Sequence, residues 1–297
     1  YHWTLTDTRK LEQQMAKAKT CFVIGAGFIS LLTVSALIKV APLNYTVVEL
    51  EDQVMPQLLD ATGGEALERG MREKGIEVIL GDSVSAIEPS SHGSASQSDG
   101  DGTRHSALGT RHYTITLGSG KSFDADMIVC GTGVRPNVDF LSGSEVKLAN
   151  GVVTNERQET NVADVYAAGD CAETHDFLSG ERVVHAIWPT AIAYPGSLSW
   201  NVTELFGLAS ASVGEFRDRP GLEPIVFHNA AANIYRKLLL DGDHLVGAVV
   251  IGRAEHIQDL GVVQAMIRRK TDISKWKHML GGERINYGML AYETIKR

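Results

Sequence analysis

Cysteine is scarce in this sequence, which disfavours two common ways of holding a fold together. Cys21, Cys130 and Cys171 are an odd number and have no C-x-x-C spacing, so neither a disulfide framework nor a zinc site is expected. Cys21 and Cys130 lie in apolar runs, where a buried and unreactive thiol is the usual outcome. The ten histidines show no metal-ligand spacing either. We therefore expect no metal site.

Long hydrophobic runs and an excess of positive charge are missing as well. The longest apolar run, residues 28–40, is interrupted by polar side chains and is shorter than the roughly 20 residues that cross a bilayer. We therefore expect no membrane contact. The formal net charge of −8 disfavours a nucleic-acid partner, because phosphate backbones are held by clustered Lys and Arg. The first residues show no signal-peptide pattern, so a cytoplasmic location is expected.

What remains is the composition of a soluble globular protein. Hydrophobic residues make up 43% of the chain and charged residues 22%, which lies in the range of folded domains. A length of 297 residues exceeds one ordinary core and predicts two or three domains.

The first half of the chain has the pattern of an α/β fold with a parallel sheet. A polar helix over residues 8–19 precedes a short apolar run that ends in glycine, which is typical of a strand buried on both faces. Strands and helices then alternate as in a Rossmann-like domain. The expected elements are strand 20–24, helix 28–40, strand 45–50, helix 64–74, strand 76–80, an antiparallel meander with strands 84–87 and 113–117, and strand 126–130. The meander is interrupted by a Ser, Gly and Asp-rich loop, residues 89–112.

The second half predicts less regular structure followed by an antiparallel sheet. We expect a turn at Asn150-Gly151, a strand over residues 164–168 and a helix over residues 190–206. Alternating segments then predict strands 225–230, 235–240 and 245–251, and a helix over residues 259–269 that packs on their sheet.

The strongest local motif follows the first buried strand. Gly25 and Gly27 would let the backbone approach a pyrophosphate at the start of the next helix, where N–H groups are free to bind it. Glu49 closes the second strand 24 positions beyond Gly25, near the spacing of about 20 that dinucleotide sites show. Ser30 replaces the usual third glycine, a small departure from the motif. The alternative is a strand, turn and helix with incidental glycines.

The acidic residue predicts which nucleotide binds. A carboxylate at Glu49 would accept hydrogen bonds from the ribose hydroxyls of NADH and repel the 2′-phosphate of NADPH. Leu50, Glu51 and Asp52 follow, so no arginine is placed to hold that phosphate. We predict NADH.

Four segments together resemble the pyridine-nucleotide FAD-dependent oxidoreductase family, which includes rubredoxin and ferredoxin reductases, the flavin part of nitrite reductases, NADH oxidases and coenzyme A disulfide reductases. The segments are residues 23–30 with 47–49, residues 131–137, residues 160–172 and residues 188–191. The resemblance implies NADH contacts at Gly25, Gly27, Phe28, Ile29, Glu49, Gly131, Thr132 and Gly133. It implies FAD contacts at Gly169, Asp170, Thr190 and Ala191, with Asp170 bonded to the ribityl chain.

The sequence departs from the family pattern in two places. Tyr194-Pro195 stands where the family commonly has Gln-Gly. Family members also begin with an FAD-binding unit of their own, with a second glycine-rich loop, and the resemblance implies that this sequence starts after that unit. The resemblance therefore implies a connector from a missing FAD-binding unit at 1–18, an NAD(H)-binding domain at 19–136, the C-terminal half of an FAD-binding domain at 137–212 and an interface-like α+β domain at 213–297.

Three functions are consistent with these observations. The first is an FAD-dependent NADH oxidoreductase, present here as an incomplete chain, that transfers hydride to flavin and then electrons to a redox protein, a disulfide or oxygen. It needs no catalytic side chain, and a separate chain or fragment would carry the missing unit. The second is a flavin-free NADH-binding or structural subunit. The third is a flavin-free dehydrogenase, disfavoured because no base with an orienting carboxylate is identifiable. The sequence leaves open whether the protein forms a homodimer.

Overall fold

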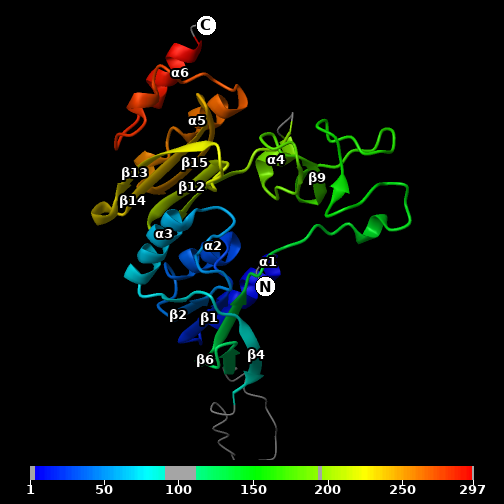
Figure 1. The fold of residues 1–297 in the computed structure, drawn as a ribbon. Coiled ribbons are helices and arrows are strands. Elements are labelled where there is room, and N and C mark those ends of the chain that lie inside the picture. Colours follow the sequence, from blue (N-terminus) through cyan, green and yellow to red (C-terminus); the bar gives the residue numbers. More distant parts are fainter. Residues whose placement is uncertain (1–3, 91–111, 193–195, 296–297) are drawn as a thin grey trace, which may run out of the picture. The chain divides into compact units, whose positions relative to one another are not determined.

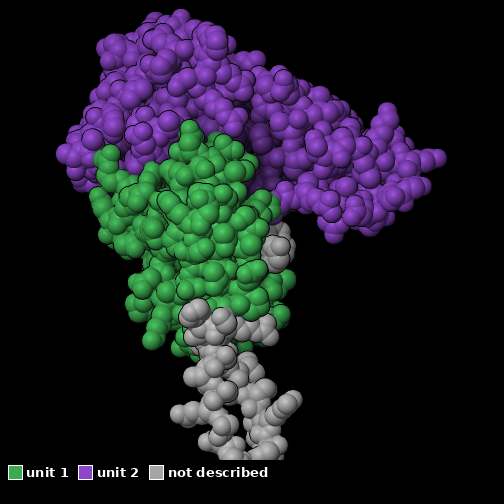
Figure 2. All heavy atoms as spheres, turned by 60° about the horizontal axis from the view of Figure 1, so that its bottom comes forward, with its two compact units in different colours: residues 1–57, 67–133 green, residues 58–66, 134–297 purple. Residues whose placement is uncertain are grey.

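The computed structural model describes residues 4–90, 112–192 and 196–295 (Figure 1). The chain forms two compact units, one of residues 1–57 and 67–133 and the other of residues 58–66 and 134–297 (Figure 2). We call them unit 1 and unit 2. The loop predicted at 89–112 lies mostly outside the described residues, as does Tyr194-Pro195.

Unit 1 is built around a parallel sheet in the order β3-β2-β1-β7. The strands are β1 (Thr20–Ile24), β2 (Asn44–Val48), β3 (Glu77–Ile79) and β7 (Met127–Cys130). Helix α2 (Phe28–Leu37) belongs to unit 1, whereas α3 (Ala61–Glu73) is divided, with residues 61–66 in unit 2 and residues 67–73 in unit 1. Phe22, Val23 and Val47 are almost fully buried, as expected of strands covered on both faces. The predicted Rossmann-like alternation is confirmed, and α3 starts three residues earlier than expected.

The predicted meander and N-terminal helix are also present in unit 1. Strands β4 (Val84–Pro89), β5 (Tyr113–Leu117) and β6 (Ser122–Ala125) form an antiparallel sheet. Helix α1 (Leu5–Met15) begins and ends earlier than the expected 8–19. The reason is a capping box, in which the Asp7 N–H donates to Thr4 Oγ1 and the Thr4 N–H donates to Asp7 Oδ2.

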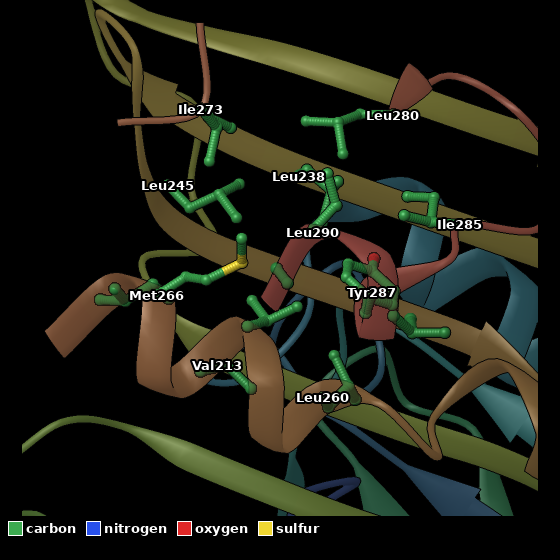
Figure 3. Close-up of a cluster of buried hydrophobic side chains, with 14 of the residues drawn as sticks. Val213, Leu238, Leu245, Leu260, Met266, Ile273, Leu280, Ile285, Tyr287 and Leu290 are labelled. Carbon is green, nitrogen blue, oxygen red and sulfur yellow. The ribbon is translucent and has the colours of Figure 1, made fainter. Parts of the chain in front are cut away.

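The C-terminal part of unit 2 is an antiparallel sheet of order β11-β12-β15-β14-β13. Its strands are β11 (Trp200–Leu205), β12 (Leu208–Gly214), β13 (Leu222–Asn229), β14 (Ile234–Asp241) and β15 (His244–Gly252). Helices α5 (Leu260–Arg268) and α6 (Tyr287–Ile295) belong to the same hydrophobic core as Val213, Leu238 and Leu245 (Figure 3). The predicted strands and the helix near 259–269 are confirmed.

The turn before α6 is tied to this sheet by one buried arginine. Arg236 on β14 donates hydrogen bonds to the backbone carbonyls of Leu280, Gly282 and Glu283. A guanidinium suits this task because its donors are fixed in one plane. The C-terminal segment is therefore an integral part of the core.

The helix predicted over residues 190–206 is wrong. The structure has a short helix, α4 (Trp188–Ile192), and then strand β11. Trp200, Val202 and Thr203 favour a strand, and β12 is available as a partner. Phe206 and Gly207 both have positive φ, 56° and 84°, which is the geometry of a tight hairpin turn between the two strands.

The rest of unit 2 is mostly irregular. Strands β8 (Val152–Val153), β9 (Ala172–His175) and β10 (Arg182–Val183) form a small sheet, with single 3₁₀ turns at Asp139–Leu141 and Gly169–Cys171. The turn predicted at Asn150-Gly151 is present, closed by a bridge between Leu148 and Val152. The strand predicted over residues 164–168 is wrong: Tyr166 makes one isolated bridge, to Glu159, because no strand among the described residues pairs along this segment.

Candidate functional site

The glycine loop after β1 joins the ends of three strands. The Gly25 N–H donates to Val48 O at 2.8 Å, and the Gly131 N–H donates to Ile24 O at 3.0 Å. Gly25 has φ +91°, and a Cβ there would lie 2.6 Å from Gly131 O. Only glycine fits both the conformation and the space. The loop therefore sits at the carboxyl edge of the parallel sheet, where α/β folds bind ligands.

Gly27 has a different environment. It is the N-cap of α2, and a Cβ built on it would meet no atom within 4 Å. The first helical bond runs from the Leu31 N–H to Gly27 O, so the N–H groups of Phe28 and Ile29 precede it. Ile29 is 44% exposed. The start of α2 thus presents free N–H groups and the positive end of the helix dipole, which favours an anion.

Ser30 takes the place of the usual third glycine without loosening the loop. Its side chain is 1% exposed and donates a hydrogen bond to Gly131 O at 3.1 Å. A Cβ on Gly131 would lie 2.1 Å from Ser30 Oγ, so glycine at 131 supplies the room that glycine at 30 would otherwise give. The helix and the strand end can still pack closely, because the glycine stands at position 131 instead of position 30.

Glu49 lies directly after β2 and turns onto the same loop. Its Oε2 accepts a hydrogen bond from the Ala26 N–H at 2.5 Å, and its Oε1 accepts one from the Glu51 N–H at 3.1 Å. Thr132 and Gly133 follow β7 and are exposed, with Gly133 at φ +104°. Unit 1 thus brings the residues predicted for NADH to one edge of its sheet. A carboxylate in this place can accept hydrogen bonds from hydroxyl groups.

The residues predicted for FAD form a second group, in unit 2. Gly169 has φ +81° and opens the turn that carries Asp170, whose side chain is exposed. A Cβ on Gly169 would lie 3.6 Å from that of Ala191, so the turn faces α4. Thr190 lies in α4, next to Ala191. The structure therefore brings both predicted segments together.

A partly buried histidine that was not predicted from the sequence contacts a residue on the far side of α4 in the chain. His185 Nδ1 lies 2.5 Å from Ser197 Oγ, and these residues stand on opposite sides of α4 in the sequence. Burial lowers the pKa of His185, and the charge of Asp176 opposes this shift. Twelve positions separate the two partners, so no local pattern could have indicated the contact.

The part of the chain that the structure describes contains neither a candidate metal cluster nor a membrane-spanning helix. No cluster of three or more His, Cys, Asp or Glu side chains is arranged to hold a metal ion. No described helix has the length and apolar character needed to cross a bilayer.

Comparison with known proteins identifies the family. The profile of the pyridine nucleotide-disulphide oxidoreductases matches residues 1–193, and that of the rubredoxin NAD+ reductase C-terminal domain matches residues 201–270. Subunit epsilon of the NADH-dependent phenylglyoxylate dehydrogenase of Aromatoleum evansii is 28% identical over 289 residues, which cover 91% of this chain and 63% of that subunit. The rubredoxin-NAD(+) reductase of Acinetobacter baylyi is 28% identical over 177 residues, 59% of this chain and 40% of that protein.

Solved structures show the same fold. The covalent complex of putidaredoxin reductase with putidaredoxin superposes with a TM-score of 0.79 at 21% identity, covering 99% of this chain and 68% of that chain. The chain thus spans less than two thirds of the length of the curated relatives named above. The predicted fold class and the predicted resemblance are both confirmed: this chain belongs to the pyridine nucleotide-disulphide oxidoreductase family.

Proposed function

We propose that this chain supplies the NADH-binding part of an FAD-dependent NADH oxidoreductase. The observation that carries the proposal is the loop Gly25–Gly27 at the start of α2 with Glu49 turned onto it. The N–H groups of Phe28 and Ile29 would bind the pyrophosphate, and Glu49 would accept hydrogen bonds from the ribose hydroxyls. To do so, Glu49 would exchange its bond from the Ala26 N–H for bonds from the nucleotide.

The remaining NADH contacts would come from the end of β7. Gly131 lies against Ser30, and Thr132 and Gly133 are exposed beside the loop end of the strand. A Cβ on Gly133 would meet nothing within 4 Å, so the space there is open to a ligand. Among the described residues, open space at Gly27 and Gly133 and the free N–H groups of α2 fit a dinucleotide.

The residues for FAD fit only its flavin end. Asp170 would accept hydrogen bonds from the ribityl hydroxyls, Gly169 would allow close approach, and the backbone of Thr190 and Ala191 would meet the ring. When bound, FAD supplies the chemistry, accepting hydride from NADH and passing electrons on. The chain's task is to orient both cofactors and exclude water, so no catalytic side chain is assigned.

We infer that another protein segment completes the FAD site. Tyr166 is 63% exposed and Trp188 is 75% exposed, and Ile192, four residues after Trp188, is also exposed. Large apolar side chains of this kind usually mark a surface that a protein covers. The covering segment would carry the ADP half of FAD, either on a longer chain or on a partner. The same exposure also favours a second candidate, a flavin-free NADH-binding or structural subunit.

The electron acceptor is proposed from the relatives. One relative is named as a reductase of rubredoxin, and a similar structure is named as a complex of putidaredoxin reductase with putidaredoxin. We propose an acceptor of this class, ahead of a disulfide or oxygen.

The visible spectrum of the purified protein, recorded with and without NADH, tests the proposal. Flavin absorbance that NADH bleaches is the expected result if the covering segment is present, and mass spectrometry would size that segment. Colourless protein that still binds NADH would favour the flavin-free subunit. Calorimetric titration with NADH and NADPH should show at least tenfold preference for NADH, lost in Glu49→Ala. No binding of NADH at all would overturn both candidates.

A further inference from the structure

Positive charge is concentrated in one short segment of this acidic protein. Five of the chain's 28 lysines and arginines lie within residues 268–277, against one of its 36 acidic residues. They are Arg268, Arg269, Lys270, Lys275 and Lys277. We call residues 268–279 the basic loop. It runs from the last residue of α5, Arg268, through the 3₁₀ turn Lys277–Met279.

The basic loop is held in one shape by the core beneath it. Ile273 is fully buried, and its N–H donates to Asp243 O at 2.9 Å. The Trp276 N–H donates to Ile273 O at 2.9 Å, and the Met279 N–H donates to Trp276 O at 2.8 Å. Leu280, the next residue, is also buried in the core. A surface fixed in this way loses little conformational entropy when a partner binds.

Only some of the positive charges of the basic loop are neutralised by acidic partners. Lys277 Nζ lies 2.5 Å from Glu223 Oε2, and Asp272 Oδ1 accepts a hydrogen bond from the Ser274 N–H. Arg269, Lys270 and Lys275 are exposed, and none of them forms an ion pair within the described part of the chain. The outer face of the loop therefore carries uncompensated positive charge.

Helix capping explains only part of this arrangement. Arg268 and Arg269 stand at the end of α5, where cations interact favourably with the helix dipole. Lys275 lies seven positions beyond the last residue of α5, outside the reach of that effect. The exposed Met279 and the partly exposed Trp276 adjoin the charges, and Arg, Met and Trp are among the residues enriched in protein interfaces.

The basic loop also contacts the segment that follows the predicted flavin turn. The Arg268 guanidinium lies over the Phe177 ring, 5.4 Å from its centroid. Phe177 comes two residues after β9, and β9 follows the Gly169–Cys171 turn directly. A partner bound at this loop would therefore rest on the same unit as the proposed flavin contacts.

We propose that the basic loop is the docking surface for a small acidic electron-transfer protein, the acceptor of the proposed reaction. This inference rests on the proposed function. An acidic carrier would be repelled by most of this negatively charged chain and drawn to the loop, so the charge pattern would both speed the encounter and orient it. The exposed apolar side chain of Met279 would add a short-range contact once the charges have met.

Binding of two probes, an acidic rubredoxin and an acidic [2Fe–2S] ferredoxin, tests the proposal without requiring flavin in the chain. At low ionic strength, about 20 mM, at least one probe should bind, and its affinity should fall steeply as salt is added. The variant Lys270→Glu/Lys275→Glu should bind that probe at least tenfold more weakly. The matched control is Arg9→Glu/Lys10→Glu, which makes the same charge change on exposed positions of α1 and should bind as the unaltered protein does.

Three results would overturn the proposal. They are no binding of either probe, equal weakening by the two double variants, and preference for phosphatidylserine vesicles or duplex DNA over both probes at the same salt. Circular dichroism melting of each variant shows whether it is folded, and Lys275→Gln, which removes one charge without reversing it, gives a milder version of the test. NADH affinity is measured on the same samples. If the proposed function is wrong, the unaltered protein does not bind NADH, whatever the docking result.

Discussion

Gly25 and Gly27 stand two positions apart in one loop, yet each is glycine for a different physical reason. At Gly25 the backbone has a positive φ and a side chain would strike Gly131 O, so the requirement comes from the fold. At Gly27 φ is −79° and the space beyond is open, so the fold tolerates a side chain there. Any requirement for glycine at 27 must come from a ligand.

Alanine at each position separates the two reasons. Gly25→Ala should destabilise unit 1 by at least about 1–2 kcal/mol, because an L-residue is strained in the left-handed region and the strand ends must part. Gly27→Ala should change the stability by about 0.5 kcal/mol or less while weakening NADH binding about tenfold. Urea unfolding and calorimetric titration measure the two effects. Unchanged NADH affinity in Gly27→Ala would place the pyrophosphate elsewhere.

Asp126 should make unit 1 sensitive to acid. Burial alone would raise the pKa of Asp126, but hydrogen bonds from the Lys19 and Thr20 N–H groups outweigh it and hold that pKa below 3.8. A lowered pKa stabilises the fold at pH values above the unfolded value of about 3.9, and this contribution is lost as pH falls through the folded pKa. Asp126→Ala should therefore cost about 1–3 kcal/mol at pH 7, and the difference from the unaltered protein should shrink below pH 4. Urea unfolding at pH 7, 4 and 3 checks this, and a difference that is constant with pH would contradict the assignment.

Single residues were predictable where their reason is local. Gly25, Gly27 and Glu49 follow strands that are visible as apolar runs, so spacing alone places them at one edge of the sheet. The pairing of Ser30 with Gly131 joins residues 101 positions apart, and no sequence pattern reports such a contact. Ser30 looked like a departure from the motif because its partner could not be seen.

At the scale of elements, the wrong predictions are again those that depend on contacts between distant parts of the sequence. Strands with strong apolar runs, such as β1 and β14, were placed correctly because burial on both faces leaves a clear signal. The segment that forms β11 mixes polar and apolar residues, so its strand propensity gives a weak signal until the pairing with β12 is known. Residues 164–168 have strand composition but no partner among the described residues, so they remain irregular.

A buried charge network links β14 to the start of α3 and was not predicted. Lys237 is 2% exposed, and its Nζ lies 2.6 Å from Asp60 Oδ2 and 3.2 Å from the more exposed Asp218. Asp60 also accepts hydrogen bonds from the Tyr235 hydroxyl and the Gly63 N–H. A lysine inside a run of buried strand residues gives no hint of its partner, which lies far away in the sequence.

Removing the negative charge of Asp60 should reduce the stability more than removing the positive charge of Lys237. Asp60→Ala leaves a buried ammonium with only Asp218, and it should destabilise unit 2 by about 3 kcal/mol or more. Lys237→Met replaces the ammonium with an apolar chain of similar length, while Asp60 keeps its bonds from Tyr235 and Gly63, so the loss should be smaller, about 1 kcal/mol. Urea unfolding of both variants, with Asp218→Ala as the exposed control, measures the difference. Equal losses would show that the network is held by packing rather than by charge.

At the scale of the whole molecule, binding and stability should divide along the two units. All the residues proposed for NADH lie in unit 1, and those proposed for the flavin lie in unit 2 with the antiparallel sheet. The family profiles also end and resume between residues 193 and 201, within the second unit. The boundary between compact units therefore differs from the boundary between family domains. A ligand that binds unit 1 tests whether the compact units are also units of stability.

Calorimetric unfolding with and without nucleotide would detect this division. A ligand that binds only the folded form stabilises it by about 2.7 kcal/mol at a concentration of 100 times Kd. NADH should therefore raise the melting temperature of one transition, that of unit 1, and leave a second transition unchanged. NADPH at the same concentration should raise the first transition by about half as much or less, because a ligand that binds tenfold more weakly stabilises by only about 1.4 kcal/mol. The proposed cause of the weaker binding is repulsion between Glu49 and the 2′-phosphate. Gly27→Ala, with its tenfold weaker binding, should reduce the NADH shift to about half without moving the transition of the ligand-free protein. A single transition that moves as a whole would mean that the two units unfold together, and the energy of nucleotide binding would then stabilise the entire chain.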